Sequence, residues 1–262
     1  MSVLEAILIA IVEGLTEFLP VSSTGHMIIT QELLGIQSTD FTKAFLVNIQ
    51  LGAILSVVVL YWKKFFQSFQ FYFKLFVAFI PAAVMGFLFS DQIDAALESP
   101  MTVGITLFIG GVIFLFIDKM IRERSLEEPN YRSAFVIGLF QCIAMIPGVS
   151  RSAATILGGM TQGLKKKSAA EFSFFLAVPT MFGATVFKMK DTLEANPDFF
   201  NSENIKLLGI GNLVAFVVGI LAIKTFVNLL TKFGFRPFGY YRILLGGILI
   251  MLLLLGVELE IG

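Results

Sequence analysis

The stretch E-G-L-T-E-F-L-P-V-S-S-T-G-H, residues 13–26, gathers polar and ionisable side chains inside an otherwise apolar segment. It contains two glutamates, three consecutive hydroxyl residues and His26, the only histidine of the chain. Charged side chains at bilayer depth cost about 2.5–3.5 kcal/mol each on insertion scales, so those that are retained usually have a function. The stretch therefore predicts a reactive site within a membrane protein.

The composition of the whole chain agrees with a membrane location. Of its 262 residues 56% are hydrophobic and only 15% are charged, and 29 are Phe. The formal net charge is zero, which gives no electrostatic reason to expect nucleic-acid binding. The single cysteine, Cys142, excludes an internal disulfide and a cysteine metal cage. The start M-S-V-L-E-A lacks the basic segment of a signal peptide, so the first apolar segment is expected to be retained.

Apolar segments of sufficient length predict the membrane spans. About 20 predominantly apolar residues in a helix cross the roughly 30 Å of hydrocarbon. The segments that fit are 44–62, 75–90, 101–118, 170–187, 207–230 and 240–257.

Two further apolar segments are interrupted, residues 3–36 by L-P-V-S-S-T-G and residues 133–164 by I-P-G-V-S-R-S. Proline removes a backbone donor, and Gly and Ser favour a turn, so each segment should form two short helices. Such a pair is typical of a re-entrant hairpin, whose irregular tip must be covered by protein or by a water-filled cavity. The predicted fold is an all-α polytopic membrane protein with six transmembrane helices and two re-entrant helical hairpins.

The basic residues predict the orientation. If neither hairpin crosses the membrane, 14 of the 19 Lys and Arg residues lie on one side. They are Lys63, Lys64, Lys74, Lys119, Arg122, Arg124, Arg132, Lys165, Lys166, Lys167, Lys224, Lys232, Arg236 and Arg242. The opposite loops and the C-terminus carry Asp91, Asp94, Glu98, Asp191, Glu194, Asp198, Glu258 and Glu260. Cytoplasmic loops are rich in Lys and Arg, so both termini are expected outside the cytoplasm.

An internal repeat is suggested by a shift of 128 residues, which superposes Glu13 on Gln141, Val21-Ser22 on Val149-Ser150 and Thr24 on Ser152. Each half then has one hairpin and three spans. Because three crossings are an odd number, the second half must be inverted, and the two hairpin tips can meet near the midplane. We expect one membrane domain over 1–262, with a first repeat over 1–121, a cytoplasmic connector over 122–132 and an inverted repeat over 133–262.

Glu13 and Glu17 are four residues apart and therefore lie on one face of the first hairpin helix. A solvated or ion-paired stripe is the ordinary explanation of such a pair, but the flanking residues are apolar and no cation follows at helical spacing. Two neighbouring carboxylates either share a proton or hold a divalent cation. Phosphate oxygens nearby would favour the cation, Mg²⁺ or Ca²⁺.

Ser22, Ser23 and Thr24 lie where the second short helix is expected to begin. Hydroxyl groups often cap a helix there, but capping does not require three of them followed by Gly25 and His26. A helix N-terminus with free N–H groups and a nearby glycine can bind an anion. His26 follows Ser23 by three residues, which makes it a candidate general base or nucleophile. The alternative is a buried histidine that only hydrogen-bonds.

The second interruption, P-G-V-S-R-S at 147–152, contributes Arg151 between Ser150 and Ser152. An arginine inside the membrane needs an anionic partner, and its planar guanidinium suits bidentate contact with phosphate. The structural alternative is pairing with Glu13 or Glu17. Carboxylates, hydroxyls, a histidine and an arginine from two converging tips together predict phosphoryl transfer.

These two motifs closely resemble the two signature motifs of the bacterial undecaprenyl-diphosphatase family, also called bacitracin-resistance proteins. The resemblance extends along the chain in length and spacing. It implies an enzyme of the bacterial inner membrane that removes the terminal phosphate from undecaprenyl diphosphate, with a site that opens to the periplasmic side. That reaction regenerates the lipid carrier for peptidoglycan and other envelope polymers, and it confers bacitracin resistance because the drug sequesters the diphosphate.

The resemblance also implies roles for individual residues. The acidic pair of the family falls on Glu13 and Glu17, its histidine on His26 and its arginine on Arg151, all of which we expect to be catalytic, together with a serine at Ser23. Headgroup binding is expected from Ser22, Thr24, Gly25, Ser150, Ser152 and Arg151.

In the expected mechanism, Arg151 and a divalent cation held by the two glutamates clamp the diphosphate, while the isoprenoid tail lies along the apolar, Phe-rich flank. Ser23 attacks the terminal phosphorus with assistance from His26. Direct attack by His26, giving a phosphohistidine, fits the spacing equally.

The rival function is a polyprenyl-phosphate flippase or transporter, because inverted repeats with broken helices occur in transporters. An ion channel is a weaker alternative, since a pore needs neither a serine triplet nor an adjacent histidine. The sequence leaves open which divalent ion is used, how strictly the tail length is selected and the oligomeric state, for which a homodimer is one option.

Overall fold

The six predicted spans are present in the computed structural model, which describes residues 1–66, 68–89, 92–93, 99–121 and 125–257. Six helices in these ranges are long and apolar enough to cross a membrane. They are α3 (Asp40–Leu60), α5 (Phe69–Leu88), α7 (Pro100–Met120), α10 (Lys166–Ala195), α11 (Ser202–Phe233) and α12 (Arg236–Leu254). A short helix α4 (Trp62–Phe65) joins α3 to α5, and an isolated bridge between Leu126 and Leu164 is the one β-type contact in the described ranges. The all-α prediction is confirmed.

Several residues used to predict the topology lie outside the described ranges. They are Asp91, Asp94, Glu98, Arg122, Arg124, Glu258 and Glu260, and the beginning of the expected connector, 122–124, lies outside them too.

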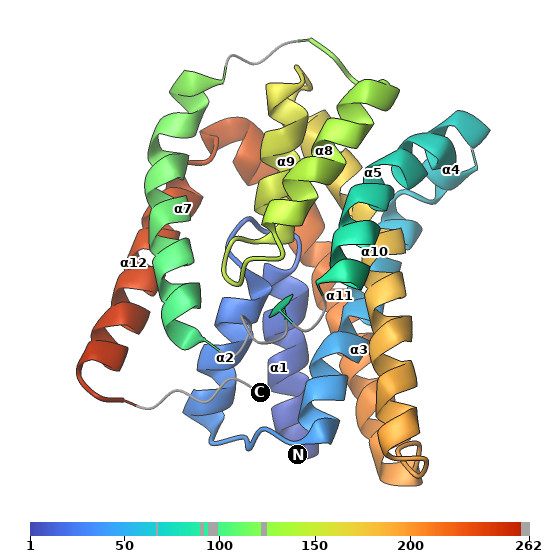
Figure 1. Cartoon of the computed structure of the whole chain (residues 1–262), viewed down its shortest axis with the longest axis vertical. Coiled ribbons are helices and arrows are strands. Elements are labelled where there is room, and N and C mark those ends of the chain that lie inside the picture. The colour runs from blue at the N-terminus through green and yellow to red at the C-terminus, as the bar shows by residue number, and fades with distance from the viewer. Residues whose placement is uncertain (67, 90–91, 94–98, 122–124, 258–262) are drawn as a thin grey trace.

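Two pairs of shorter helices occupy the two interrupted segments. Helices α1 (Val3–Thr16) and α2 (Ser23–Leu34) flank the first break, and α8 (Tyr131–Ile143) and α9 (Arg151–Thr161) flank the second. Even the longest of the four, with 14 residues, extends only about 21 Å, which is less than the hydrocarbon thickness. In Figure 1, α1 and α2 enter the centre from the lower end and α8 and α9 from the upper end, so the two turns meet.

Each turn ends at a serine with a left-handed backbone. Ser22 has φ 69° and Ser150 has φ 76°, and no other non-glycine residue of the described ranges has a positive φ. The hydroxyl of each serine accepts a hydrogen bond from the N–H three residues later, of Gly25 and Ala153 respectively, and thereby caps the next helix. Positive φ is uncommon for residues with a side chain, so the same device at positions 128 residues apart is a specific similarity.

Helices α7 and α12 pack against each other through glycines. A Cβ atom on Gly111 would lie 2.8 Å from the carbonyl oxygen of Gly239, and a Cβ atom on Gly239 would lie 2.9 Å from that of Gly111. The contact is reciprocal, and these glycines are again 128 residues apart. Equivalent positions that meet in this way are characteristic of a two-fold relationship.

Helices α3 and α11 are joined by a partly buried amide network. The side-chain oxygen of Asn212 accepts a hydrogen bond from the N–H of Gly52 at 2.7 Å. Its amide nitrogen donates to the side chain of Asn48 at 2.7 Å and to the carbonyl of Leu208 at 2.8 Å. Polar groups at bilayer depth need such internal partners, because lipid offers none.

Ion pairs connect the basic segments at one end of the molecule. Asp118, in the last turn of α7, pairs with Lys166 at 2.7 Å and also accepts a hydrogen bond from the N–H of Phe235 at 2.7 Å. Further pairs are Lys64–Glu128, Lys74–Glu128 and Lys165–Glu127. The connections around α4, α7, α8, α10 and the α11–α12 turn therefore lie together, as the distribution of basic residues predicts.

Arg242 does not belong to that basic end, so the prediction that it lies with the other basic residues on one side is wrong. It lies within α12 and is only 1% exposed. The carbonyl oxygens of the two turns supply the hydrogen-bond partners that let this charge lie inside the protein.

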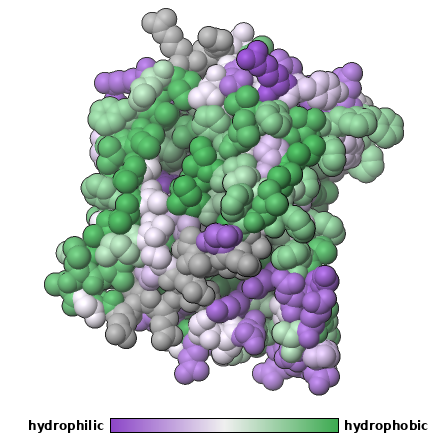
Figure 2. Space-filling model, in the orientation of Figure 1, coloured by the Kyte–Doolittle hydropathy of each residue, from purple (hydrophilic) through white to green (hydrophobic). Residues whose placement is uncertain are grey.

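Large apolar side chains cover much of the outer surface. Figure 2 shows them (green) over most of one face, with hydrophilic residues (purple) gathered toward its upper and lower ends. Phe69, Phe87 and Leu213 are 85%, 80% and 64% exposed. Exposed apolar surface on this scale is expected of a protein whose surroundings are lipid.

Candidate active site

The two helix-pair turns are joined by side chains that cross from one to the other. Ser152, in the first turn of α9, donates a hydrogen bond to the carbonyl of Leu19 at 2.8 Å. Arg151, the first residue of α9, donates to Glu17, the residue that ends α1, also at 2.8 Å. The predicted convergence of the two tips is confirmed.

Glu17, Ser23 and Arg151 form one hydrogen-bonded cluster. The hydroxyl of Ser23 donates to one carboxylate oxygen of Glu17 at 2.7 Å, and Arg151 donates to the other. Arg151 also donates hydrogen bonds to Ser173 of α10, to its carbonyl oxygen at 3.0 Å and to its hydroxyl oxygen at 3.3 Å. Its Nε is buried and has no hydrogen-bond partner within the described ranges, so this donor is free to bind a ligand. Of the predicted partners for Arg151, Glu17 is the one it contacts.

Glu13 lies one turn before Glu17 and is completely buried. Neither of its carboxylate oxygens has a hydrogen-bond partner among the described residues. A buried carboxylate without partners is costly unless it carries a proton or faces a cation.

The residues around Glu13 fit a divalent cation only in part. No group of three or more His, Cys, Asp or Glu side chains in the described ranges could hold a metal ion by itself. Both oxygens of Glu17 are engaged by Ser23 and Arg151, so only Glu13 offers free carboxylate oxygens. Mg²⁺ is commonly held by one or two carboxylates together with substrate phosphate and water, and the unpartnered Glu13 fits that pattern.

His26 points toward α12. Its Nδ1 lies 2.7 Å from the carbonyl oxygen of Ser22, and its Nε2 lies 2.6 Å from the hydroxyl of Tyr241. Both ring nitrogens therefore have partners, and the hydroxyl of Ser23 is bonded to Glu17. The expected assistance of Ser23 by His26 is not a hydrogen bond in this arrangement, because the one proton of the serine hydroxyl is donated to Glu17.

Tyr241 was not singled out from the sequence. It lies beside His26 with the two rings nearly parallel, at an interplanar angle of 6° and a centroid distance of 5.5 Å. The two side chains are among those that line an apolar groove of about 490 Å³ between α1, α11 and α12. Its other lining residues are Leu15, Thr16, Leu19, Val21, Leu221, Ala222, Thr225, Phe226, Leu229, Pro237 and Phe238.

Arg242 holds the backbone of both turns. Its two terminal nitrogens donate to the carbonyl of Pro20 in the first turn at 3.0 Å and to Gly148 in the second turn at 2.9 Å. Further bonds reach the carbonyls of Val149, Thr106 and Leu107 at 3.1, 3.2 and 3.4 Å. The guanidinium also lies over the ring of Phe114, 5.2 Å from its centroid. An arginine next to the apolar run I-L-L-G-G-I-L-I was the signal in the sequence that could have identified it.

Most of the predicted headgroup-binding residues build the turns. Ser22 and Ser150 are helix caps, and the hydroxyl of Ser150 lies 3.1 Å from that of Ser152. Ser152 is completely buried, and Gly25 is buried against α7, where an added Cβ would lie 3.1 Å from Leu107. These four residues therefore shape the site. Their contact with a headgroup stays a prediction, and so does the contact of Thr24, which is partly exposed.

Comparison with known proteins identifies the family. The family model described as bacitracin resistance protein BacA matches residues 6–248, which include both turns and Arg242. The chain belongs to the BacA family. It is 60% identical over 252 residues to a protein of Flavobacterium psychrophilum named undecaprenyl-diphosphatase, with 96% of each chain covered. Proteins of the same name from Porphyromonas gingivalis and Bdellovibrio bacteriovorus are 52% and 51% identical and are covered over 100% and 99% of both chains.

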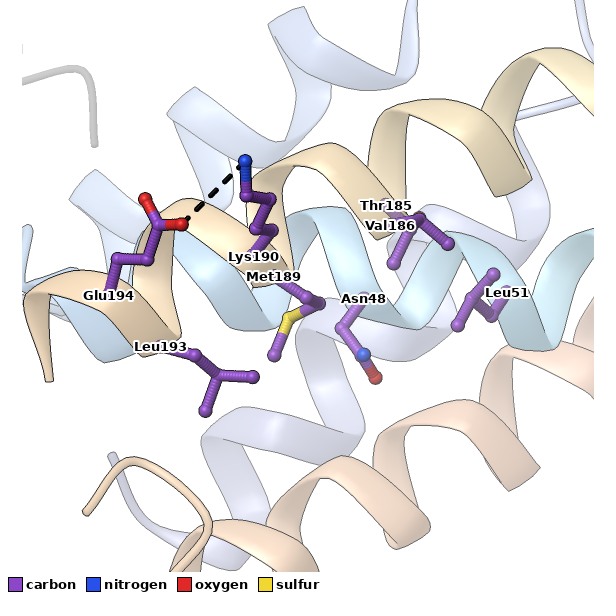
Figure 3. A pocket seen from close by; sticks show the side chains of 8 residues that line it. All are labelled: Asn48, Leu51, Thr185, Val186, Met189, Lys190, Leu193 and Glu194. Atoms are coloured by element: carbon purple, nitrogen blue, oxygen red, sulfur yellow. Dashed lines mark ion pairs between the residues drawn. The ribbon is translucent and has the colours of Figure 1, made fainter. Parts of the chain in front are cut away.

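A second cavity of this BacA-family chain, of about 500 Å³, lies between α3 and α10 (Figure 3). Its charged residues are Lys190 and Glu194, which pair with each other at 3.6 Å and are both largely exposed. In Figure 3 this ion pair and the amide of Asn48 point in opposite directions. The cavity has no hydroxyl–carboxylate–arginine cluster, so the described residues provide the chemistry for phosphoryl transfer at the two turns and not here.

Proposed function

We infer that the chain is an integral membrane phosphatase that hydrolyses undecaprenyl diphosphate to undecaprenyl phosphate and inorganic phosphate. The observation that carries this conclusion is the cluster of Glu17, Ser23 and Arg151 across the two turns. It stands in a chain 51–60% identical, over nearly its whole length, to proteins named undecaprenyl-diphosphatase. The product is the lipid carrier for peptidoglycan synthesis. Removal of the diphosphate deprives bacitracin of its target and gives resistance.

The two helix pairs are re-entrant hairpins in this proposal, and the chain is a single membrane domain of two inverted repeats. The first repeat covers 1–121 and the second 133–262, with the cytoplasmic connector 122–132 between them. Support comes from the matching caps at Ser22 and Ser150, from the reciprocal contact of Gly111 with Gly239, and from the opposite directions of entry in Figure 1.

The protein resides in the bacterial inner membrane in this proposal, with the basic end in the cytoplasm. The ion-paired connections around Asp118 and Glu128 then face inward, in accord with the preference of cytoplasmic loops for Lys and Arg. The N-terminal helix pair enters from the other end, so both termini are outside and the site opens to the periplasmic side.

In the first chemical step, Arg151 binds the terminal phosphate with its free Nε and the edge next to it. The oxygen of Ser23 attacks the phosphorus while its proton passes to Glu17, which already accepts a hydrogen bond from it at 2.7 Å. The bridging P–O bond breaks and undecaprenyl phosphate leaves as an anion. A divalent cation on Glu13, when bound, would neutralise charge on the phosphates.

In the second step, water hydrolyses the phosphoserine. The water oxygen bonds to phosphorus, and its proton passes to the hydroxyl oxygen of Tyr241, which gives its own proton to Nε2 of His26. The bond from phosphorus to Ser23 breaks, the serine recovers its proton from Glu17, and inorganic phosphate leaves. Direct attack on the substrate by Nε2 is the second candidate, because the hydrogen bond to Ser22 leaves that nitrogen unprotonated; the hydrogen bond from Tyr241 to Nε2 must then break first.

The isoprenoid tail occupies the apolar groove between α1, α11 and α12. His26, Tyr241 and Val21 of the first turn line this groove, so a chain lying in it would pass beside that turn. The apolar lining matches a hydrocarbon tail, and the volume of about 490 Å³ takes several isoprene units.

The decisive measurement is phosphate release from undecaprenyl diphosphate by purified protein in detergent, with and without chelator. Wild type should release phosphate and Ser23→Ala should lose at least about 10³-fold in rate, whereas Ser125→Ala, at an exposed residue, should match wild type. A flippase needs two compartments and a hydrolase needs none, so the absence of release in detergent would favour the transporter.

The nucleophile can be identified separately. Rapid quenching with labelled substrate, followed by mass spectrometry, should locate phosphate on Ser23. Phosphate on His26 would establish direct attack, and label on neither residue would contradict both mechanisms.

A further inference from the structure

We propose that Tyr241 is a positioning residue that, together with the carbonyl of Ser22, holds His26 in one tautomer with Nε2 as its reactive nitrogen. The inference rests on the proposed phosphatase function and deepens it. It assigns a role to a residue on the last helix, 215 positions from the histidine that it contacts.

The contact with Ser22 determines which nitrogen carries the proton. A backbone carbonyl can only accept a hydrogen bond, so Nδ1, at 2.7 Å from it, must be the donor. In a neutral imidazole the other nitrogen then has the lone pair. Ser22 is itself held in a left-handed conformation as the cap of α2, which fixes the direction of its carbonyl.

The contact with Tyr241 determines where that lone pair points. A phenol is a good donor, and its oxygen lies 2.6 Å from Nε2. The two nearly parallel rings both line the apolar groove between α1, α11 and α12. Without this partner only the bond from Nδ1 to Ser22 would orient the imidazole, and the direction of the lone pair would be less tightly fixed.

The residue that follows Tyr241 fixes the position of this tyrosine relative to the two turns. The next residue, Arg242, is buried and donates to carbonyls of both turns. Tyr241 is therefore fixed to the same turns that carry the reactive serine and arginine. A hydroxyl can both donate and accept, so the phenolic oxygen can accept the water proton while its own proton passes to Nε2, and the resulting N–H then donates to the phenolic oxygen. Tyr241 can hold the ring in both protonation states.

The test uses the fact that the chain has only one histidine. Protein labelled with ¹⁵N at histidine, and purified with a tag that contains none, gives imidazole signals from His26 alone. Wild type should show a protonated Nδ1 and an unprotonated, hydrogen-bonded Nε2. In Tyr241→Phe the Nε2 signal should move toward that of a free unprotonated nitrogen, and kcat should fall about tenfold with KM within about twofold, as for loss of one orienting hydrogen bond.

Tyr240→Phe is the matched control, since Tyr240 is adjacent and 65% exposed. Its spectrum and kcat should equal those of wild type. A wild-type spectrum with the proton on Nε2, or an unchanged spectrum and kcat in Tyr241→Phe, would overturn the proposal. The proposal would also be overturned if Tyr241→Phe lowered both kcat and the unfolding temperature but left the imidazole spectrum unchanged. If wild type releases no phosphate, the proposed function fails, whereas the spectrum still reports on the contact.

Discussion

Arg151 donates a hydrogen bond of 2.8 Å to Glu17 across 134 residues of sequence. The pair joins the end of α1 to the start of α9, and only 13% of the arginine side chain and 6% of the glutamate side chain are exposed. Both charges are thereby neutralised in the absence of substrate. An incoming phosphate can bind the arginine through its free Nε without breaking that contact.

Replacement of Arg151 by Lys should lower the rate of phosphate release by about 10²-fold or more, because lysine keeps the charge but lacks the planar pair of donors. Arg132→Lys, at an exposed position in the first turn of α8, is the control and should leave the rate unchanged. Near-normal turnover of Arg151→Lys would indicate that Arg151 only balances the carboxylates.

Glu13 should determine the response to divalent cations. Its two buried oxygens lack partners within the described ranges, so Glu13→Gln should raise the concentration of Mg²⁺ or Ca²⁺ needed for half-maximal activity by about tenfold or more. The measurement is a cation titration after removal of metal by chelator, with exposed Glu32→Gln as the control. An unchanged titration in Glu13→Gln would mean that this carboxyl carries a proton and holds no cation.

Arg242 should be a determinant of stability. Its removal leaves buried carbonyl oxygens of both turns without donors, and each such group costs about 1–3 kcal/mol. Arg242→Met should therefore lower the unfolding free energy by several times that amount. It should also lower the unfolding temperature in detergent by more than Arg236→Met does. Arg236→Met is the control, because Arg236 is exposed and makes a single long bond of 3.4 Å to Leu115. Equal unfolding temperatures for the two variants would contradict this role.

The α3–α11 contact makes a prediction about glycine. A Cβ atom on Gly52 would overlap the carbonyl oxygen of Asn212, so Gly52→Ala must push the helices apart and should cost about 1–3 kcal/mol. Gly209, on the same α11, has open space where a Cβ would lie, with no neighbouring atom of the described residues within 4 Å. Gly209→Ala should instead be neutral or stabilise the helix by up to about 1 kcal/mol. Thermal unfolding in detergent compares the two, and equal effects would refute the packing argument.

The course of the chain was largely predictable from its sequence. Length and hydropathy suffice for the six long helices, because lipid requires continuous apolar helices of a set length. The breaks at 17–22 and 144–150 follow from Pro, Gly and Ser in apolar surroundings. The meeting of Glu17 with Arg151 followed from the cost of an unpaired charge in the membrane.

The hydrogen-bond partners of His26 and the buried position of Arg242 could not be predicted from the sequence in this way. Local spacing places His26 near Ser23, but the packing of α12 brings Tyr241 to its ring and leaves the serine to Glu17. Arg242 follows two tyrosines near a helix start, which resembles the edge of a membrane span. Only the tertiary fold shows that the carbonyls of two distant turns surround it.

The bonds from Arg242 to Pro20 and Gly148 also bear on whether the chain could carry its lipid across the bilayer. Alternating access requires one repeat to rock against the other around a central site. Here a single buried guanidinium bonds to both turns, so movement of one turn against the other would break its hydrogen bonds at every cycle. Turns joined in this way suit in-line displacement at phosphorus, for which reacting atoms must be held in register.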